Sequence, residues 1–280
     1  IILKKIGIFP IRDHYYEPLF DTSKLKKDLA DPRYLPGIDF QLKKQLRFLQ
    51  NLNFQQEFST FIETQSNVNG KSKFEFGNKS FESGDAEFLF NFIRFTKPNR
   101  VIEIGCGSST KIIAHALQLN DVDAGMASNH FCVEPYEQPW LDDLPNITLL
   151  RDKVEDIDCS VFKSLGENDL LFIDSSHIIR PQGDVLHIYL TLLPLLKKGV
   201  YVHVHDIFSP RDYLKEFISD KVVFWNEQYL LEATLSKNPR FQIAASLNLL
   251  KHDSFDALKE VCTYLTKDRE PGSFYFQIVE

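Results

Sequence analysis

The chain has 280 residues, a formal net charge of -7 at pH 7 and a hydrophobic fraction of 43%. This length and composition allow a full hydrophobic core, and they predict one large domain or one domain with an appendage. The acidic balance disfavours nucleic-acid binding and anionic-membrane binding, because both need a basic surface. A small or neutral ligand is more compatible with this charge.

The four cysteines are widely spaced, at Cys106, Cys132, Cys159 and Cys262. No C-x-x-C pair occurs, so the spacing indicates neither a disulfide framework nor a zinc cluster, and a reducing cytoplasm is the expected location. No window of about 18 apolar residues is present, so we expect no membrane span. The first residues, Ile-Ile-Leu-Lys-Lys, carry neither an initiator Met nor a signal-peptide pattern, which predicts that upstream sequence precedes them.

The N-terminal part of the chain predicts little regular structure. Residues 1–37 are rich in Pro, Asp, Tyr and Lys without a sustained period, so we expect an irregular arm that lies on the main domain. Leucines at helical spacing predict a helix over residues 40–61, and residues 67–77 are polar and predict a loop. Residues 1–82 are therefore interpreted as an arm and helical region that caps the substrate pocket of a main domain at 83–280.

The main domain begins with an apolar stripe over residues 83–97, which predicts a helix that starts at Ser83 or Asp85 and ends before Pro98. Five apolar runs then alternate with helical patterns, at residues 101–104, 130–133, 147–150, 169–173 and 200–204. Such alternation predicts crossover connections and a parallel sheet. The polar residues 121–129 predict a surface insertion before the second strand.

Downstream, the patterns predict a helix at 226–237, a strand at 241–245, a helix from Ser254 and a last strand at 273–278. The last two strands are expected to pair at one edge of the sheet. The predicted fold is therefore α/β: a Rossmann-like, mostly parallel, seven-stranded sheet with helices on both faces, preceded by the N-terminal arm and helix.

The segment "VIEIGCGSST", at residues 101–110, combines a strand, an acid and two glycines. Gly105 and Gly107 allow a sharp turn and a close approach to a ligand. Thr110 occupies the third glycine position of a dinucleotide fingerprint, and no Gly-Lys-[Ser/Thr] follows, so NAD and a phosphate loop are both disfavoured. A carboxylate from Glu103 near this turn would repel a pyrophosphate and favour a cationic ligand such as a sulfonium.

The same segment resembles motif I of the class I S-adenosylmethionine-dependent methyltransferases, E/D-x-G-x-G. Two later segments, "HFCVEPYEQPW" and "LLRDKVEDI", are similar to the family's second and third strands. The resemblance implies that Glu134 accepts hydrogen bonds from the ribose hydroxyls and that Asp152 lies near adenine, although a solvated acidic loop is an equal explanation for Asp152. The implied contacts to S-adenosylmethionine are Glu103, Gly105, Gly107, Ser108, Glu134, Asp152 and Asp174.

Four chemistry-bearing side chains follow the fourth and fifth predicted strands, namely Asp174, His177, His205 and Asp206. Open parallel sheets bind ligands at the carboxyl ends of their strands. Methyl transfer to a hydroxyl needs in-line approach and removal of the hydroxyl proton. We expect His177 to be the base, with His205 as the rival and Asp174 beside it.

A metal ion is a further possibility at this place. In related sugar and natural-product O-methyltransferases, acids that match Asp174 and Asp206 hold a magnesium ion. In this chain His205 precedes Asp206, so metal dependence is left open and a softer divalent ion is an alternative to magnesium. His203 is expected to be a core histidine. The segment Trp225-Asn226-Glu227-Gln228 combines an aromatic face with three polar groups, which suits either a sugar site or a helix start.

The sequence thus predicts an enzyme that methylates a hydroxyl of a sugar or another hydroxylated small metabolite with S-adenosylmethionine. Its expected partner is a small molecule, not nucleic acid. The alternatives are a catalytically idle cofactor-binding or scaffold module of a larger polysaccharide-biosynthesis protein and, less favoured, a nicotinamide oxidoreductase. The acceptor, the choice between O- and N-methylation, the metal and the oligomeric state are left open by the sequence.

Overall fold

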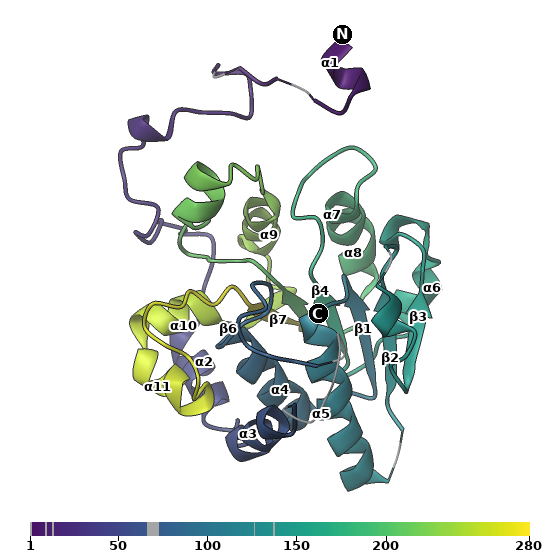
Figure 1. Ribbon diagram of the computed structural model, residues 1–280. Helices are drawn as coiled ribbons and strands as arrows, with labels where there is room; N and C mark the ends of the chain where they lie inside the picture. Colours follow the sequence, from purple (N-terminus) through teal and green to yellow (C-terminus); the bar gives the residue numbers. More distant parts are fainter. Residues whose placement is uncertain (1, 9, 13, 66–72, 126, 137) are drawn as a thin grey trace.

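The computed structural model describes residues 2–8, 10–12, 14–65, 73–125, 127–136 and 138–280. Its centre is a seven-stranded sheet of order β3-β2-β1-β4-β5-β7-β6 (Figure 1). The strands are β1 Arg100–Ile104, β2 Asn129–Val133, β3 Ile147–Leu150, β4 Leu170–Ile173, β5 Tyr201–Val204, β6 Phe241–Ser246 and β7 Phe274–Ile278. Strands β1 to β5 are parallel, and β7 is antiparallel to both β5 and β6. The predicted fold class and the closing pair of strands are confirmed.

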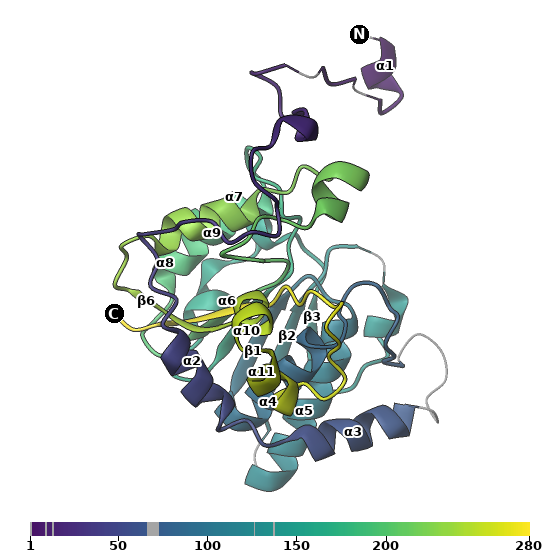
Figure 2. The same ribbon diagram turned by 90° about the vertical axis from the view of Figure 1, so that its left-hand side faces the viewer.

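Helices cover both faces of the sheet (Figures 1 and 2). Side chains alternate between the faces along each strand, so Val101 of β1 joins one core while Ile102 and Ile104 join the other. The helices of the first face are α2 Leu42–Leu49, α3 Gln55–Thr64, α4 Asp85–Thr96, α5 Ser108–Ala124, α10 Leu247–Asp253 and α11 Phe255–Val261. Those of the second face are α6 Cys159–Lys163, α7 Asp184–His187, the π-helix η6 Ile188–Leu192, α8 Leu193–Leu195 and α9 Glu227–Leu235.

The shorter elements lie in the connections between these layers. They are α1 Ile2–Lys5, the 3-10 turns Thr22–Lys24, Pro139–Leu141 and Val154–Asp156, and the π-helix Glu216–Asp220. Among the described residues, the helices are too short or too polar to span a bilayer.

The single helix expected at 40–61 is wrong, because α2 and α3 are separate helices. The amide of Asn51 donates to the carbonyl of Arg47 at 3.1 Å, which ends α2, and the Phe54 N–H donates to Asn91 Oδ1 of α4 at 2.8 Å. Side-chain amides therefore satisfy backbone groups that a continuous helix would have paired. Both helices pack into the core of the first face, α2 on β6 and α3 on α4.

Two further expectations need correction. The polar insertion expected at 121–129 is partly helical, because α5 continues to Ala124 and ends at Gly125, whose φ of 63° is left-handed. Helix α10, Leu247–Asp253, was not predicted; it follows β6 directly, and its N-cap residue Ser246 makes no side-chain capping hydrogen bond. The loop expected at 67–77 lies partly outside the described residues.

The N-terminal arm lies on the main domain only in its later part. Both views show α1 standing apart from the sheet, so the expectation is wrong for the start of the arm (Figures 1 and 2). From Pro18 onward the arm contacts the domain, because Pro18 lines a cavity together with Trp225. Arg33 forms ion pairs with Glu232 of α9 and Asp212. The boundary placed at residue 83 stays a prediction.

Candidate functional site

The turn after β1 can be built only around a glycine at position 105. Gly105 has a φ of 79°, and a Cβ at this position would lie 1.9 Å from the carbonyl oxygen of Asp174. Backbone hydrogen bonds hold the turn between neighbouring strands, from Gly105 N to Val133 O at 3.0 Å and from Asp174 N to Ile104 O at 2.9 Å. The loop after β4 therefore lies directly against the glycine turn.

Glu134 joins the loops that follow β1 and β2. One carboxylate oxygen accepts from the Cys106 N–H at 3.1 Å, and the other accepts from the Tyr136 N–H at 3.0 Å. Beside it lies a cavity of about 230 Å³, which Gly105 and Asp174 also line. Lys153 and Glu155 line the same cavity. Asp152, which follows β3 closely, is exposed and does not line it.

Glu103 does not line this cavity. Its side chain is fully buried on the α5 side of the sheet, where Ser109 Oγ donates to Oε1 at 2.6 Å and His130 Nε2 lies 3.0 Å from Oε2. Ser108, the residue before Ser109, is the first residue of α5. The structure therefore places Glu103 where it fixes the first turn of α5, while Gly105 and Glu134 face the cavity.

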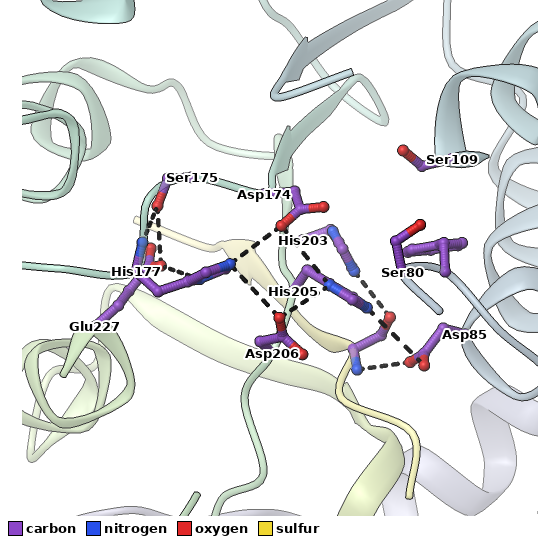
Figure 3. Close-up of polar contacts among 12 residues, drawn as sticks. Ser80, Asp85, Ser109, Asp174, Ser175, His177, His203, His205, Asp206 and Glu227 are labelled. Atoms are coloured by element: carbon purple, nitrogen blue, oxygen red, sulfur yellow. Dashed lines mark hydrogen bonds and ion pairs between the residues drawn. The ribbon is translucent and has the colours of Figure 1, made fainter. Parts of the chain in front are cut away.

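A second and larger cavity, of about 880 Å³, lies at the ends of β4 and β5. Its wall includes all four residues that the sequence singled out here, Asp174, His177, His205 and Asp206. Asp174, Ser175 and Ser176 line both cavities, so the two meet at the loop after β4. The cluster is shown in Figure 3.

His177 is the centre of this cluster (Figure 3). Its Nε2 lies 3.2 Å from Asp174 Oδ1 and 3.6 Å from Asp206 Oδ2. Its Nδ1 lies 2.9 Å from Glu227 Oε2, an oxygen that also accepts from Ser175 Oγ at 3.0 Å. Glu227 is fully buried at the first turn of α9; the sequence placed it in a segment that suits either a sugar site or a helix start, but did not predict its contact with His177. Glu227 is 50 positions from His177 in the sequence, and only the fold brings the two side chains together.

The charges in this cluster shift one another's pKa. Burial alone would raise the pKa of Asp174, but the imidazoles of His205 and His177 outweigh it and hold that pKa well below its usual range. Burial would lower the pKa of His177, but its contacts with Asp174 and Glu227 raise it to about 10. The pKa of His205 is raised by Asp206 and Asp174 against burial. Burial raises the pKa of Asp206.

Two residues of the cluster have a left-handed backbone although they are not glycines. The φ of His177 is 59° and that of Asp206 is 54°. Such conformations are unfavourable for side-chain-bearing residues and concentrate at functional sites. The His177 turn is held in place because its carbonyl accepts from the N–H groups of Asn226 and Glu227 at 2.9 and 3.1 Å.

His205 and His203 have different surroundings. His205 Nδ1 lies 3.8 Å from Asp174 Oδ1 and 3.7 Å from Asp206 Oδ2, so it faces the cluster. His203 is fully buried, stacks on Phe172 with ring centroids 4.1 Å apart, and its Nε2 pairs with Ser273 Oγ at 2.9 Å. Burial lowers the pKa of His203. These are the surroundings of a neutral core histidine.

Comparison with known proteins adds a family match. A methyltransferase-domain family model matches residues 102–207, which extend from β1 past the end of β5 and include His177, His205 and Asp206. A curated relative from Archaeoglobus fulgidus, described as an uncharacterized protein, is 29% identical over 176 residues. The alignment covers 59% of this chain and 77% of that relative.

Several solved structures are similar in outline. A cmcI structure described as Mg-SAM has a TM-score of 0.39 and 14% identity, and the match covers 71% of this chain and 73% of that one. A SAM dependent methyltransferase from Archaeoglobus fulgidus has a TM-score of 0.36 and 14% identity, with 70% and 94% covered. The plantazolicin methyltransferase BpumL, in complex with a triazolic desmethylPZN analog and SAH, has a TM-score of 0.38 and 10% identity, with 85% and 98% covered.

The family match coincides with the part of the fold that carries the motifs. Residues 102–207 hold the glycine turn, Glu134 and the cluster around His177. The seven-stranded sheet around them has the architecture that the motif resemblance implies. Residues 102–207 are therefore similar to a methyltransferase domain, and the fold around them is that of a mostly parallel α/β sheet.

Proposed function

We propose that this protein transfers a methyl group from S-adenosylmethionine to a hydroxyl of a sugar or another hydroxylated small metabolite. One observation supports this proposal above the others: the cavity beside the glycine turn and the larger cavity around His177 meet at Asp174 and Ser175. A methyl donor in the first cavity can then face an acceptor in the second, which is what in-line transfer requires.

The smaller cavity suits the cofactor. When bound, S-adenosylmethionine supplies an electrophilic methyl group on a cationic sulfur. In this proposal Gly105 lines the cofactor cavity, Gly107 follows in the same loop, and Glu134 accepts from the ribose hydroxyls with lone pairs that its two backbone contacts leave free. Asp152 is proposed near adenine. Glu103 contributes through Ser109, by holding the first turn of α5 in place.

His177 is our candidate for the general base. Its Nε2 faces Asp174, at the junction of the two cavities, and Glu227 holds the opposite nitrogen. With a pKa of about 10, the imidazole carries a proton at neutral pH. A positive charge bound beside Asp174 would lower that pKa, because it disfavours the imidazolium, and the ring would then release its Nε2 proton to solvent. His177 then accepts the hydroxyl proton at Nε2, with Asp174 and His205 orienting the acceptor.

The same cluster has donors for a divalent metal ion. One ligand atom each from Asp174, His177 and Asp206 lie within 4.8 Å of one another. The Nδ1 of His177 is hydrogen-bonded to Glu227, which leaves Nε2 for a metal. Such a hydrogen bond orients many metal-binding histidines. These residues, with His205 as a fourth candidate, would hold magnesium or a softer divalent ion. Such an ion would acidify a substrate hydroxyl.

The larger cavity suits a polyhydroxylated acceptor. Its lining contains carboxylates and imidazoles together with the aromatic residues Phe208, Phe217 and Trp225. The Trp225 ring lies against His177, with centroids 4.6 Å apart. Sugars present hydroxyl edges and apolar faces, so a lining that contains both polar and aromatic groups matches them.

Mass spectrometry of reaction mixtures tests the proposal. The purified protein is incubated with S-adenosylmethionine and a panel of sugars, nucleotide sugars and phenols, and the products are screened for an added methyl group together with S-adenosylhomocysteine. Methylation of an acceptor hydroxyl supports the proposal. Failure of the cofactor to bind contradicts it, whereas binding without turnover on any acceptor favours the idle-module alternative.

A further inference from the structure

A second cluster of chemistry-bearing side chains lies on the α5 side of the sheet, outside both cavities. It comprises Glu103, Cys106, His130 and Cys132, with at most 5% of each residue exposed. His130 Nε2 lies 3.0 Å from Glu103 Oε2 and 3.4 Å from Cys132 Sγ. Cys132 Sγ lies 3.8 Å from the same Glu103 oxygen. The proposed methyl transfer uses none of these contacts directly.

The topology explains how widely spaced residues form one cluster. His130 and Cys132 are two positions apart on β2, so both side chains point to the same face. Glu103 of β1 is in register with Cys132 and points to that face too. The Cys106 thiol, in the loop after β1, lies in the same buried cluster as Cys132, with its Sγ 3.9 Å from the Glu103 carbonyl oxygen. Cysteine spacing alone indicated no zinc cluster, because the cluster depends on strand register and includes a histidine and a glutamate.

We propose that Glu103, His130 and Cys132 bind a zinc ion, with the Cys106 thiolate as the fourth ligand. Tetrahedral zinc, with bonds of about 2.3 Å to sulfur and about 2.0 to 2.1 Å to nitrogen and oxygen, separates neighbouring ligand atoms by roughly 3.3 to 3.6 Å. The three measured separations of 3.0, 3.4 and 3.8 Å fall around this range. A single point can therefore be reached by all three donors after shifts of a few tenths of an ångström.

The donor set selects the metal. Two thiolates, an imidazole and a carboxylate are ligands for zinc, whereas magnesium and calcium prefer oxygen donors alone. Ser109 Oγ donates to the second oxygen of Glu103, which orients the carboxylate toward the cluster. Burying several ionisable groups together is costly, and a bound cation offsets that cost. The ion would tie the glycine turn, through Cys106, to β2.

Metal content and cobalt spectroscopy test this site without any assay of methyl transfer. Protein from zinc-supplemented cultures is measured by inductively coupled plasma mass spectrometry, and we expect about one zinc per chain. The ion should resist chelators in the native state and be released on unfolding, because the site is buried. Cobalt in its place should give a thiolate-to-cobalt charge-transfer band in the near ultraviolet.

Matched variants separate this site from others. Cys132→Ser should lose the metal and the band, whereas Cys159→Ser, which changes a half-buried cysteine on α6, should keep both. Asp206→Asn should also keep the band, because the cluster around His177 contains no thiol. If Cys132→Ser does not fold, the wild-type protein decides the question. Wild-type protein that holds less than about a tenth of an equivalent of zinc, or a cobalt form without the thiolate band, overturns the proposal.

Discussion

Gly105 and Gly107 are two positions apart in one loop, yet substituting them should change the stability of the fold by very different amounts. A Cβ at Gly105 would collide with the Asp174 carbonyl at 1.9 Å, and the φ of 79° is unfavourable for any other residue. Gly105→Ala should therefore lower the free energy of unfolding by about 3 kcal/mol or more. Gly107 has an extended φ of -167°, and a Cβ there meets no atom within 4 Å.

Gly107→Ala is thus the control, and it should change the free energy of unfolding by less than about 1 kcal/mol. Urea denaturation of the two variants measures both values. A similar loss in both variants would show that the turn is not built against the loop after β4. Because Gly107→Ala keeps the fold, its cofactor affinity then reports whether S-adenosylmethionine lies over position 107.

Glu227 should act as a positioning residue for His177. Glu227→Gln keeps an oxygen for Ser175 but removes the negative charge that helps to raise the pKa of His177. We expect turnover on the identified acceptor to fall about 10-fold to 100-fold, and the acidic limb of the pH–rate profile to move to lower pH. A purely structural role would lower the rate without moving that limb.

His177→Ala provides the comparison for the Glu227 variant. If His177 is the base, its removal should lower turnover by about 100-fold to 10,000-fold while cofactor affinity changes little, since a base acts mainly in the transition state. Turnover and isothermal titration calorimetry measure the two effects. Full activity in this variant contradicts the catalytic role of the cluster.

At the scale of secondary-structure elements, the start of α4 depends on a buried acid. Glu87 Oε2 accepts from the Gly84 N–H at 2.7 Å, and Oε1 accepts from the Tyr264 N–H at 2.5 Å. Burial raises the pKa of Glu87 from 4.5 to about 7, against these two hydrogen bonds. The folded state therefore binds the proton more tightly than the unfolded state. The stabilisation that protonated Glu87 contributes is complete below pH 4.5 and is lost as the pH rises through 7.

Urea denaturation between pH 5 and pH 8 tests this linkage. The free energy of unfolding of the wild type should fall by up to about 3 kcal/mol relative to that of Glu87→Gln across this window. Glu260→Gln, which changes an exposed residue of α11, should follow the wild type. Parallel pH curves for the wild type and Glu87→Gln would show that Glu87 keeps an ordinary pKa in the folded protein.

The elements with a strong local signal could be predicted from the sequence, and those determined by tertiary contacts could not. The apolar strands and the long helices α4 and α5 have such a signal. The break between α2 and α3 depends on Asn91 of α4, a partner 37 positions from Phe54. Local propensity contains no information about such a partner.

The candidate site divides in the same way. Asp174, His177 and Asp206 could be found because each follows a strand of a parallel sheet, and such positions meet at one edge. The contact of Glu227 with His177 could not be predicted, because it depends on how α9 packs back over the loop after β4. The cluster around His130 was missed because register between β1 and β2 assembles it, not cysteine spacing.

At the scale of the whole molecule, cofactor binding should appear as thermal stability. A ligand that binds only the folded chain at 100 times its Kd adds about 2.7 kcal/mol, which raises the Tm of a protein of this size by roughly 5 °C. We expect this shift from S-adenosylmethionine and S-adenosylhomocysteine but not from NAD, measured by differential scanning fluorimetry. Glu134→Ala should lose most of the ligand-induced shift, because it removes the proposed ribose contact, whereas the exposed Glu167→Ala should retain it. A shift from NAD alone would contradict the cofactor assignment, and a full shift in Glu134→Ala would place the ribose elsewhere in the cavity.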